Sequence, residues 1–371
     1  MNNGKDQPMS VKVKEQFQVS PVMAFFLIHA MQVGIGVLGY QQVIAKVSGY
    51  DSWISILLAG IMVSILISII YYLLNHGRDD VIGIHKALFG RWAGDTLSFL
   101  FIIYLFILGI VVLRTYIEIV QVWVFEDLPT WVLTILAAYF LYYAVSGGFR
   151  AVTGLCVAGV FIPSVIFFIL LMPLEYGKFL NLLPLFKTSF DKLMLGARES
   201  TLSFLGFELL LLFYPFLKEQ RSSQKWAQIG HWTSVFVYVV LMIVTLAFFS
   251  EPQLKMTIWP TLTLFKIIEF PFVERFEYLG ISIWMVIVAP NIAMTFWAAS
   301  RGMKRLFPMK QRSAVIILTI LTVVVTPLIE DRENIDTFND IISKIGFWTV
   351  LVYIPFLCLC QFLAEKIRKK E

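Results

Sequence analysis

The sequence is poor in charged residues. Asp, Glu, Lys and Arg make up only 15% of the 371 residues, while hydrophobic residues make up 58%. Soluble globular chains carry about 25% charged residues, so an ordinary soluble domain is excluded. The mean hydropathy of +0.79 and the recurrence of apolar runs of about 20 residues instead predict an integral membrane protein.

Cysteine and histidine are also scarce, with 3 and 4 residues respectively. Cys156, Cys358 and Cys360 lie in apolar segments without the spacing of metal ligands, and their odd number argues against a disulfide framework. The chain has no close His/Cys cluster and no Gly-rich phosphate loop ahead of a soluble helix. We therefore expect no enzymatic activity, no metal centre and no cofactor beyond a coupling ion.

Ten apolar runs are long enough to cross a bilayer, and we expect each to form a transmembrane helix. The predicted fold is all-α, with no large soluble domain between the runs. The ten runs are 19–45, 53–74, 96–125, 128–149, 151–174, 200–217, 226–250, 278–300, 313–329 and 345–364.

The distribution of Lys and Arg predicts the orientation, because positive residues that flank spans stay in the cytoplasm. Most of them fall on one side when residues 1–18 are cytoplasmic, which also makes the tail 365–371 cytoplasmic. The polar stretch 1–18 does not resemble the start of a signal peptide. The net charge of +5 thus indicates orientation, and no nucleic-acid partner is expected.

Glycine interrupts two of the runs. Gly34, Gly36 and Gly39 cluster in the first run, and Gly206 precedes a charged residue, Glu208, in the sixth. A backbone that leaves the helix at membrane depth exposes N–H and C=O groups that lipid cannot bind but a polar solute can. These breaks predict a binding site for a small polar molecule at mid-membrane.

The broken helices are the first and the sixth, so they cross the membrane in opposite directions. This arrangement predicts a five-plus-five inverted repeat with helices 1 and 6 unwound at mid-membrane. The halves are 19–174 and 198–364, joined by an outer link, 175–197. A second link, 251–277, is expected to form short helices over the outer mouth; the alternative is an interfacial segment that packs on the outer surface.

The two breaks have opposite polarity. Free N–H groups after Gly34-Ile35-Gly36 favour a carboxylate, although the glycines could instead serve tight helix packing. The first half of the sixth helix, which ends at the break 203–208, is expected to leave unpaired carbonyls that favour an ammonium group. Together the breaks predict a zwitterion, which is an amino acid.

Glu208 is the most informative single residue, because a carboxylate at mid-membrane is costly and usually functional. It could hold the ligand's amine, carry a proton, or brace the unwound backbone through hydrogen bonds. The alternative is a purely structural, permanently protonated carboxyl bonded to neighbouring backbone.

The two breaks resemble those of the amino acid, polyamine and organocation transporter superfamily, which has the LeuT-like fold. Gly34-Ile35-Gly36 is similar to its helix 1 motif, and Phe204-Leu205-Gly206-Phe207-Glu208 to its helix 6 motif. Within the superfamily the chain resembles the endospore germination permeases, the B subunits of germinant receptors. This resemblance implies a protein of the spore inner membrane that senses an L-amino acid beside an A-type membrane subunit and a C-type lipoprotein.

The resemblance also implies that helices 3 and 8 complete the site, where Tyr104 and Leu108, and Asn291 and Thr295, are pairs four residues apart. For each of them ordinary interhelical hydrogen bonding is an alternative. The predicted ligand-binding set is Gly34, Ile35, Gly36, Gly39, Tyr104, Leu108, Ser203, Phe204, Gly206, Phe207, Glu208, Asn291 and Thr295.

Coupling and signalling stay open at this stage. The resemblance to sodium-coupled relatives implies a possible sodium site near Gly34 and Thr295. Proton-coupled relatives can place a lysine on helix 5, but none stands in 151–174, which leaves sodium, a proton on Glu208 or no coupling. Arg114 and Glu118 predict an ion pair or an aqueous path. The chain is expected to be a receptor subunit whose ligand shifts a conformational balance, or else a stand-alone amino-acid permease.

Overall fold

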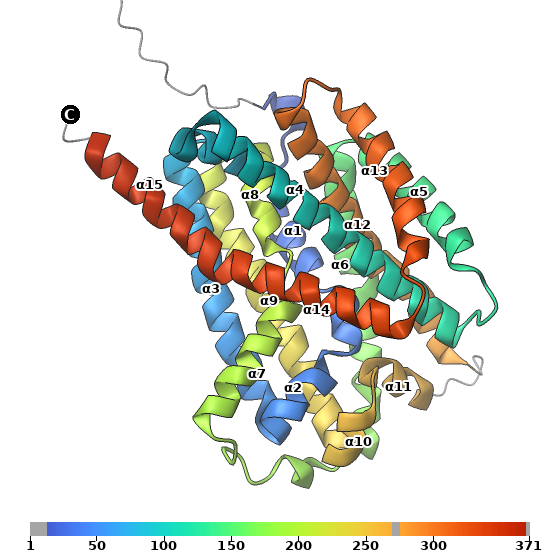
Figure 1. Ribbon diagram of the computed structural model, residues 1–371. Helices are drawn as coiled ribbons and strands as arrows, with labels where there is room; N and C mark the ends of the chain where they lie inside the picture. Colours follow the sequence, from blue (N-terminus) through green and yellow to red (C-terminus); the bar gives the residue numbers. More distant parts are fainter. Residues whose placement is uncertain (1–12, 269–274, 369–371) are drawn as a thin grey trace, which may run out of the picture.

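The computed structural model describes residues 13–268 and 275–368, which form an all-helical bundle (Figure 1). The parts of the predicted tails and of the link 251–277 that fall outside these ranges are outside the described residues. The first half of the chain forms α1 (Met23–Gln32), α2 (Tyr40–Ser48), α3 (Ser52–Gly77), α4 (Val81–Trp123), α5 (Thr130–Ser146) and α6 (Phe149–Ile169). The second half forms α7 (Phe190–Ser203), α8 (Leu210–Phe213), α9 (Gln220–Phe248), α10 (Glu251–Met256), α11 (Pro260–Ile267), α12 (Phe276–Leu306), α13 (Gln311–Val325), α14 (Arg332–Trp348) and α15 (Ile354–Arg368).

The predicted number of spans agrees with the helices. In the described ranges, 7 helical stretches are long and apolar enough to cross a membrane. Three shorter apolar helices, Met23–Gln32, Thr130–Ser146 and Phe207–Phe216, accompany them. Together they account for the ten apolar runs of the sequence and confirm an all-α membrane protein.

Both predicted breaks are present. Between α1 and α2 the chain leaves the α-helix at Val33 and forms a short 3-10 turn, Ile35–Leu38. Between α7 and α8, Gly206 has a φ of +114°, a conformation that side-chain-bearing residues rarely adopt, and a 3-10 turn, Phe207–Leu209, follows. Helices 1 and 6 are therefore unwound in their middle.

Two helices begin much earlier than the sequence predicted. The sixth span starts at Phe190 rather than residue 200, within the range predicted to be the outer link. The tenth starts at Arg332 rather than residue 345, and a π-helical turn, Thr349–Tyr353, joins α14 to α15. Both extensions carry charged side chains, including Glu199 and Asp336, that border a cavity, so a criterion based on long uncharged runs misses them.

We call the end of the bundle that holds α10 and α11 the link side, and the end where α1 begins and α12 ends the tail side; they lie at the bottom and top of Figure 1. α12 packs against α4 and α6, and α1 packs against α9. α3 contacts both α7 and α9, so the two broken helices are enclosed by continuous ones.

The tail side is closed by aromatic packing and backbone pairing. Phe149, Phe216 and Trp297 are buried and pack against one another in tilted and edge-to-face pairs, with ring centroids 4.6 to 5.0 Å apart. Val19 exchanges two backbone hydrogen bonds of 2.9 Å with the strand-like segment around Leu217. This pairing ties the segment before α1 to the segment after α8.

Candidate functional site

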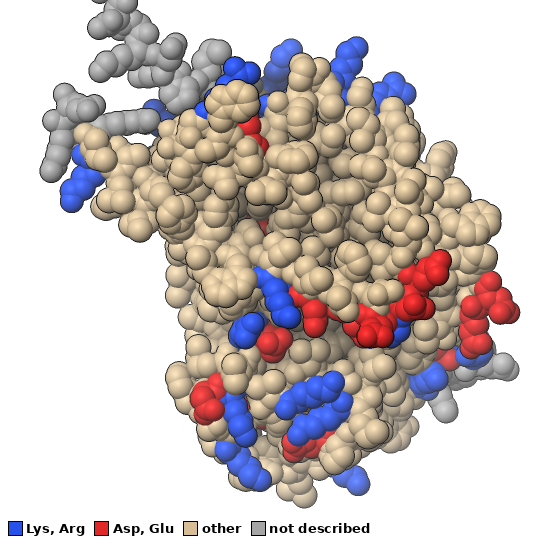
Figure 2. All heavy atoms as spheres, viewed as in Figure 1, with Lys and Arg blue, Asp and Glu red and all other residues tan. Residues whose placement is uncertain are grey.

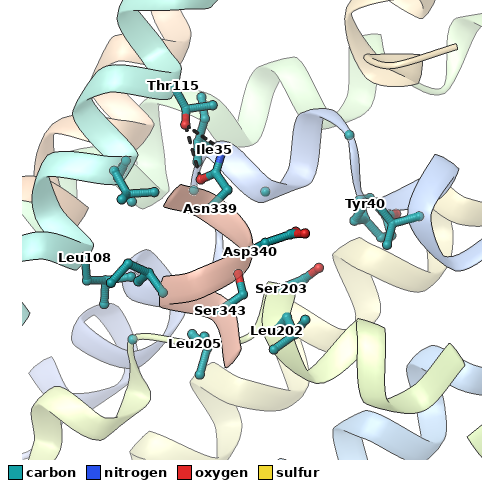
Figure 3. A pocket seen from close by; sticks show the side chains of 18 of the residues that line it. Ile35, Tyr40, Leu108, Thr115, Leu202, Ser203, Leu205, Asn339, Asp340 and Ser343 are labelled. Carbon is teal, nitrogen blue, oxygen red and sulfur yellow. Dashed lines mark hydrogen bonds between the residues drawn. The ribbon is translucent and has the colours of Figure 1, made fainter. Parts of the chain in front are cut away.

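A cavity of about 620 Å³ lies where the two broken helices meet. The first break, the second break, α4 and α12 all contribute to its wall, and side chains from α14 point into it (Figure 3). The predicted residues that line it are Gly34, Ile35, Gly36, Gly39, Leu108, Ser203, Gly206, Asn291 and Thr295. The structure therefore brings both breaks and both partner helices into one space.

The other predicted residues, Tyr104, Phe204, Phe207 and Glu208, are buried and do not line this cavity. Phe204 packs against the ring of Tyr238, with centroids 4.9 Å apart. These side chains pack against the broken backbone on the side away from the cavity.

Glu208 has both carboxylate oxygens occupied by the protein itself. The hydroxyl of Tyr104 donates a hydrogen bond of 2.6 Å to Oε1, and the backbone N–H of Gly206 donates one of 2.7 Å to Oε2. Of the roles considered from the sequence, these contacts match the brace of the unwound backbone. They also fasten the second break to α4.

The carbonyl ends of α1 and α7 converge on one side chain. The Tyr238 hydroxyl lies 2.9 Å from the carbonyl oxygen of Gln32 and 3.0 Å from that of Ser203. Sequence reasoning missed Tyr238, because a single tyrosine in the apolar run 226–250 carries no signal of its own. It holds the two helix ends together beside the cavity.

Gly34 and Gly36 serve different purposes. The Asn291 amide donates a 2.5 Å hydrogen bond to the Ala30 carbonyl, and a Cβ on Gly34 would overlap Asn291 Oδ1. Gly34 is thus required for packing, which is the alternative role that the sequence analysis gave for these glycines. A Cβ on Gly36 would meet no atom closer than 3.8 Å, so Gly36 keeps its part of the cavity open.

α14 gives the cavity a polar wall that the sequence analysis did not find. Asp340, Asn339 and Ser343 project from α14 toward the broken helices in Figure 3, and Asn339 is hydrogen-bonded to Thr115 of α4. The signal was available as polar residues at spacings of three and four, the period of one helix face. The lining residues of α14 are Arg332, Asp336, Asn339, Asp340, Ile342 and Ser343.

The predicted ion pair between Arg114 and Glu118 is wrong. Arg114 donates to the carbonyl oxygens of Ile329 and Glu330, at 2.6 and 2.9 Å, and so caps the end of the segment after α13. Glu118 instead pairs with Arg332 at 2.6 Å. A spacing of four residues permits an ion pair on one helix, but the packing of α14 against α4 offers each side chain a better partner.

The link after α9 forms two short helices, α10 and α11, as predicted. Gln41 of α2 donates to the Thr261 hydroxyl at 2.7 Å, and Thr261 donates to the Val37 carbonyl at 2.8 Å. Ile258 and Trp259 line the cavity, and the Arg332 guanidinium lies 5.2 Å from the centre of the Trp259 ring. This segment therefore covers the link side of the cavity and is bonded to the first broken helix.

The possible sodium site near Gly34 and Thr295 has few free oxygens. The carbonyl of Gly34 accepts from Trp284 at 3.3 Å, and the hydroxyl of Thr295 donates to the Ile292 carbonyl at 2.8 Å. Asn291 Oδ1 has no hydrogen-bond donor among the described residues. Sodium coupling stays a prediction.

Comparison with known proteins identifies the family. Residues 18–335 match the family model described as spore germination protein. The chain belongs to the spore germination protein family. It is 43% identical to the spore germination protein GerQB of Bacillus cereus, over 95% of this chain and 98% of that protein. It is 25% identical to the spore germination protein YndE of Bacillus subtilis, with the same coverage.

A solved structure supports the fold of this family member. The chain superposes on Mhp1, a nucleobase-cation-symport-1 family transporter in a closed conformation with bromovinylhydantoin bound, with a TM-score of 0.63. The match covers 94% of this chain and 81% of Mhp1 at 10% identity. It shows a LeuT-like transporter fold, and at this identity it shows the fold alone.

Proposed function

We propose that this chain is the membrane subunit of a spore germinant receptor and that it binds a small L-amino acid in the cavity between the broken helices. The family match supports a membrane protein of spore germination, either a receptor subunit or a permease. The observation that carries the ligand assignment is the meeting of both breaks in one cavity.

The ligand class follows from the polarity of the helix ends. α7 ends at Ser203, and its end carries partial negative charge although the Ser203 carbonyl already accepts from Tyr238. α2 begins at Tyr40, where its first N–H groups carry partial positive charge. Ser203 and Tyr40 both line the cavity. A zwitterion can place its ammonium near the first and its carboxylate near the second.

The proposed orientation puts the tail side in the cytoplasm. Figure 2 shows Lys and Arg at the tail side, mixed acidic and basic side chains along α14 and the link side, and a largely uncharged band between them. Positive residues favour the cytoplasmic side of a membrane. The cavity then faces the outside of the spore inner membrane, with both termini inside.

In this proposal the chain works beside an A-type membrane subunit and a C-type lipoprotein. Ligand binding shifts the balance between two conformations, and the partner subunits respond to the change. The chain has no catalytic role. A stand-alone permease coupled to sodium or protons is the second candidate, and the transporter fold favours it.

The deciding experiment is uptake of labelled L-alanine and L-valine into liposomes that contain the purified chain, with equilibrium binding measured on the same samples. A nucleobase joins the panel because Mhp1 is described as a nucleobase-cation symport family transporter. Saturable amino-acid binding without net flux or exchange is the expected result for a receptor subunit. Concentrative uptake or exchange would make the chain a permease, and binding of the nucleobase alone would overturn the amino-acid assignment.

A further inference from the structure

We propose that Asp340 of α14 binds the ammonium group of the ligand, which makes α14 part of the recognition site. This inference rests on the proposed function, because it concerns the same cavity. It adds a carboxylate outside the two helix breaks to the zwitterion site.

The first step is to account for the acidic side chains around the cavity. Glu208 does not line it, and both of its oxygens accept hydrogen bonds from Tyr104 and Gly206. Asp336 lines the cavity but pairs with Arg332 at 3.1 Å. Two lining carboxylates, Glu199 and Asp340, have no ion-pair or hydrogen-bond partner among the described residues.

The second step is the direction of the Asp340 side chain. In Figure 3 it points from α14 into the open space beside Tyr40, and the hydroxyls of Ser203 and Ser343 border the same space. Ser203 is the last residue of α7. Asp340 therefore faces the end of α7 at which an ammonium group is already favoured by the helix dipole.

The position of Glu199 makes it the weaker candidate. Glu199 stands four residues before Ser203 on α7, one helical turn away from the break. Asp340 and Ser203 line the same cavity, and in Figure 3 both side chains project into its open space. An ammonium held between Asp340 and the carbonyl end of α7 leaves the ligand's carboxylate directed toward Tyr40, the first residue of α2.

The consequence is a connection between α14 and the ligand. α14 is joined to α4 through Arg332 with Glu118 and through Asn339 with Thr115, and neither contact involves the broken helices. α14 also contacts α7 directly, where the Arg198 guanidinium lies 5.2 Å from the centre of the Phe347 ring. A ligand bound to both Asp340 and the breaks adds a second connection between α14 and α7, at the cavity. Ligand binding then favours the conformation in which α14 lies closest to the breaks.

The test compares an amino acid with its analogue that lacks the amine. Binding to the purified chain is measured for L-alanine against propionate and for L-valine against 3-methylbutanoate. Asp340 is exposed, so its ion pair with the ligand stays in contact with water. Asp340→Asn is therefore expected to weaken binding of the amino acid by about two- to fivefold, and to leave binding of the amine-free acid unchanged. Asp340→Glu should retain part of the affinity for the amino acid.

Glu333→Gln is the matched control, since Glu333 is an exposed carboxylate on α14 that does not line the cavity. It should bind both ligands as the wild type does. Asp340→Ser serves as a second neutral variant if Asp340→Asn does not fold, with thermal unfolding of each variant as the check.

Amino-acid binding that is unchanged in Asp340→Asn would overturn the assignment of Asp340 and leave the proposed function standing. Loss of binding in Glu199→Gln but not in Asp340→Asn would also overturn it and move the role to Glu199. Failure of the wild type to bind any amino acid would overturn the proposed function, and this inference with it.

Discussion

Gly34 and Gly36 stand two residues apart in the first break but have different surroundings. Gly34 packs against the Asn291 amide, whereas Gly36 borders open space. Both were predicted as site residues because three glycines in six residues exceed what tight helix packing needs. Which of them packs and which opens the cavity depends on α12, and that could not be read from the first run alone.

At the residue scale we predict that Gly34→Ala lowers the free energy of unfolding by roughly 1–3 kcal/mol, because the new methyl group overlaps Asn291 Oδ1. Gly36→Ala is the matched control and should unfold like the wild type, since its nearest neighbour lies at 3.8 Å. Thermal unfolding of the two variants in detergent checks this. Equal destabilisation by both substitutions would contradict the assignment of the packing role to Gly34.

Glu208 gives a second prediction at this scale. Glu208→Leu leaves the Tyr104 hydroxyl and the Gly206 N–H without their acceptor, at a cost of roughly 1–3 kcal/mol for each donor. Glu208→Gln should be close to wild type, because its oxygen can accept from Gly206 while its amide donates to the Tyr104 oxygen. Thermal unfolding and ligand binding are the measurements. A Gln variant as damaged as the Leu variant would show that the charge, and not the brace, is needed.

At the scale of elements, the starts of α7 and α14 were predicted too late in the chain. The positions of α1 and α2 were predicted well. α1 and α2 contain one Lys and no Arg, Asp or Glu, whereas α7 and α14 each carry several charged side chains, some of which border the cavity. Long uncharged runs identify helices that contact lipid. This criterion misses helical turns whose charged faces border the cavity. It therefore missed the part of α14 that carries Asp340.

Contacts at the end of the α13 segment and at the start of α14 also explain why Arg114 and Glu118 do not pair. Arg114 and Glu118 are four residues apart on α4, which is sufficient for a pair only if nothing better is near. The partners that replace it, the Ile329 carbonyl and Arg332, are more than 200 positions away in sequence. No local pattern predicts them.

An element-scale prediction concerns the junction of α12 with the turn between α3 and α4. Arg305 pairs with Asp79 at 2.8 Å and also with Asp80, whose carboxylate accepts from the first N–H groups of α4. Arg305→Ala leaves two poorly solvated carboxylates side by side, and we expect it to cost about 3–5 kcal/mol of stability.

The control for Arg305 is its neighbour Lys304, which is exposed. Lys304→Ala removes the same formal charge and should leave the unfolding temperature within error of the wild type. If both alanine variants unfold at the wild-type temperature, the junction does not stabilise the tail side.

At the scale of the whole molecule, the orientation predicted from Lys and Arg can be tested by labelling. In a chain whose native cysteines are replaced, Lys255→Cys on α10 should react with a membrane-impermeant maleimide added outside cells, because α10 lies on the link side. Lys310→Cys, before α13 on the tail side, should react only after the membrane is permeabilised. The reverse pattern would invert the topology and place the cavity on the cytoplasmic side.

The central claim is that the cavity between the two breaks is the ligand site, and equilibrium binding to Gly36→Leu tests it most directly. A leucine there fills space that the cavity now holds, while Gly36→Ala adds only a methyl group with no close neighbour. The account predicts saturable binding of an L-amino acid by the wild type, binding by Gly36→Ala, and none by a Gly36→Leu protein that still unfolds cooperatively. Wild-type affinity in the folded Gly36→Leu protein would contradict it.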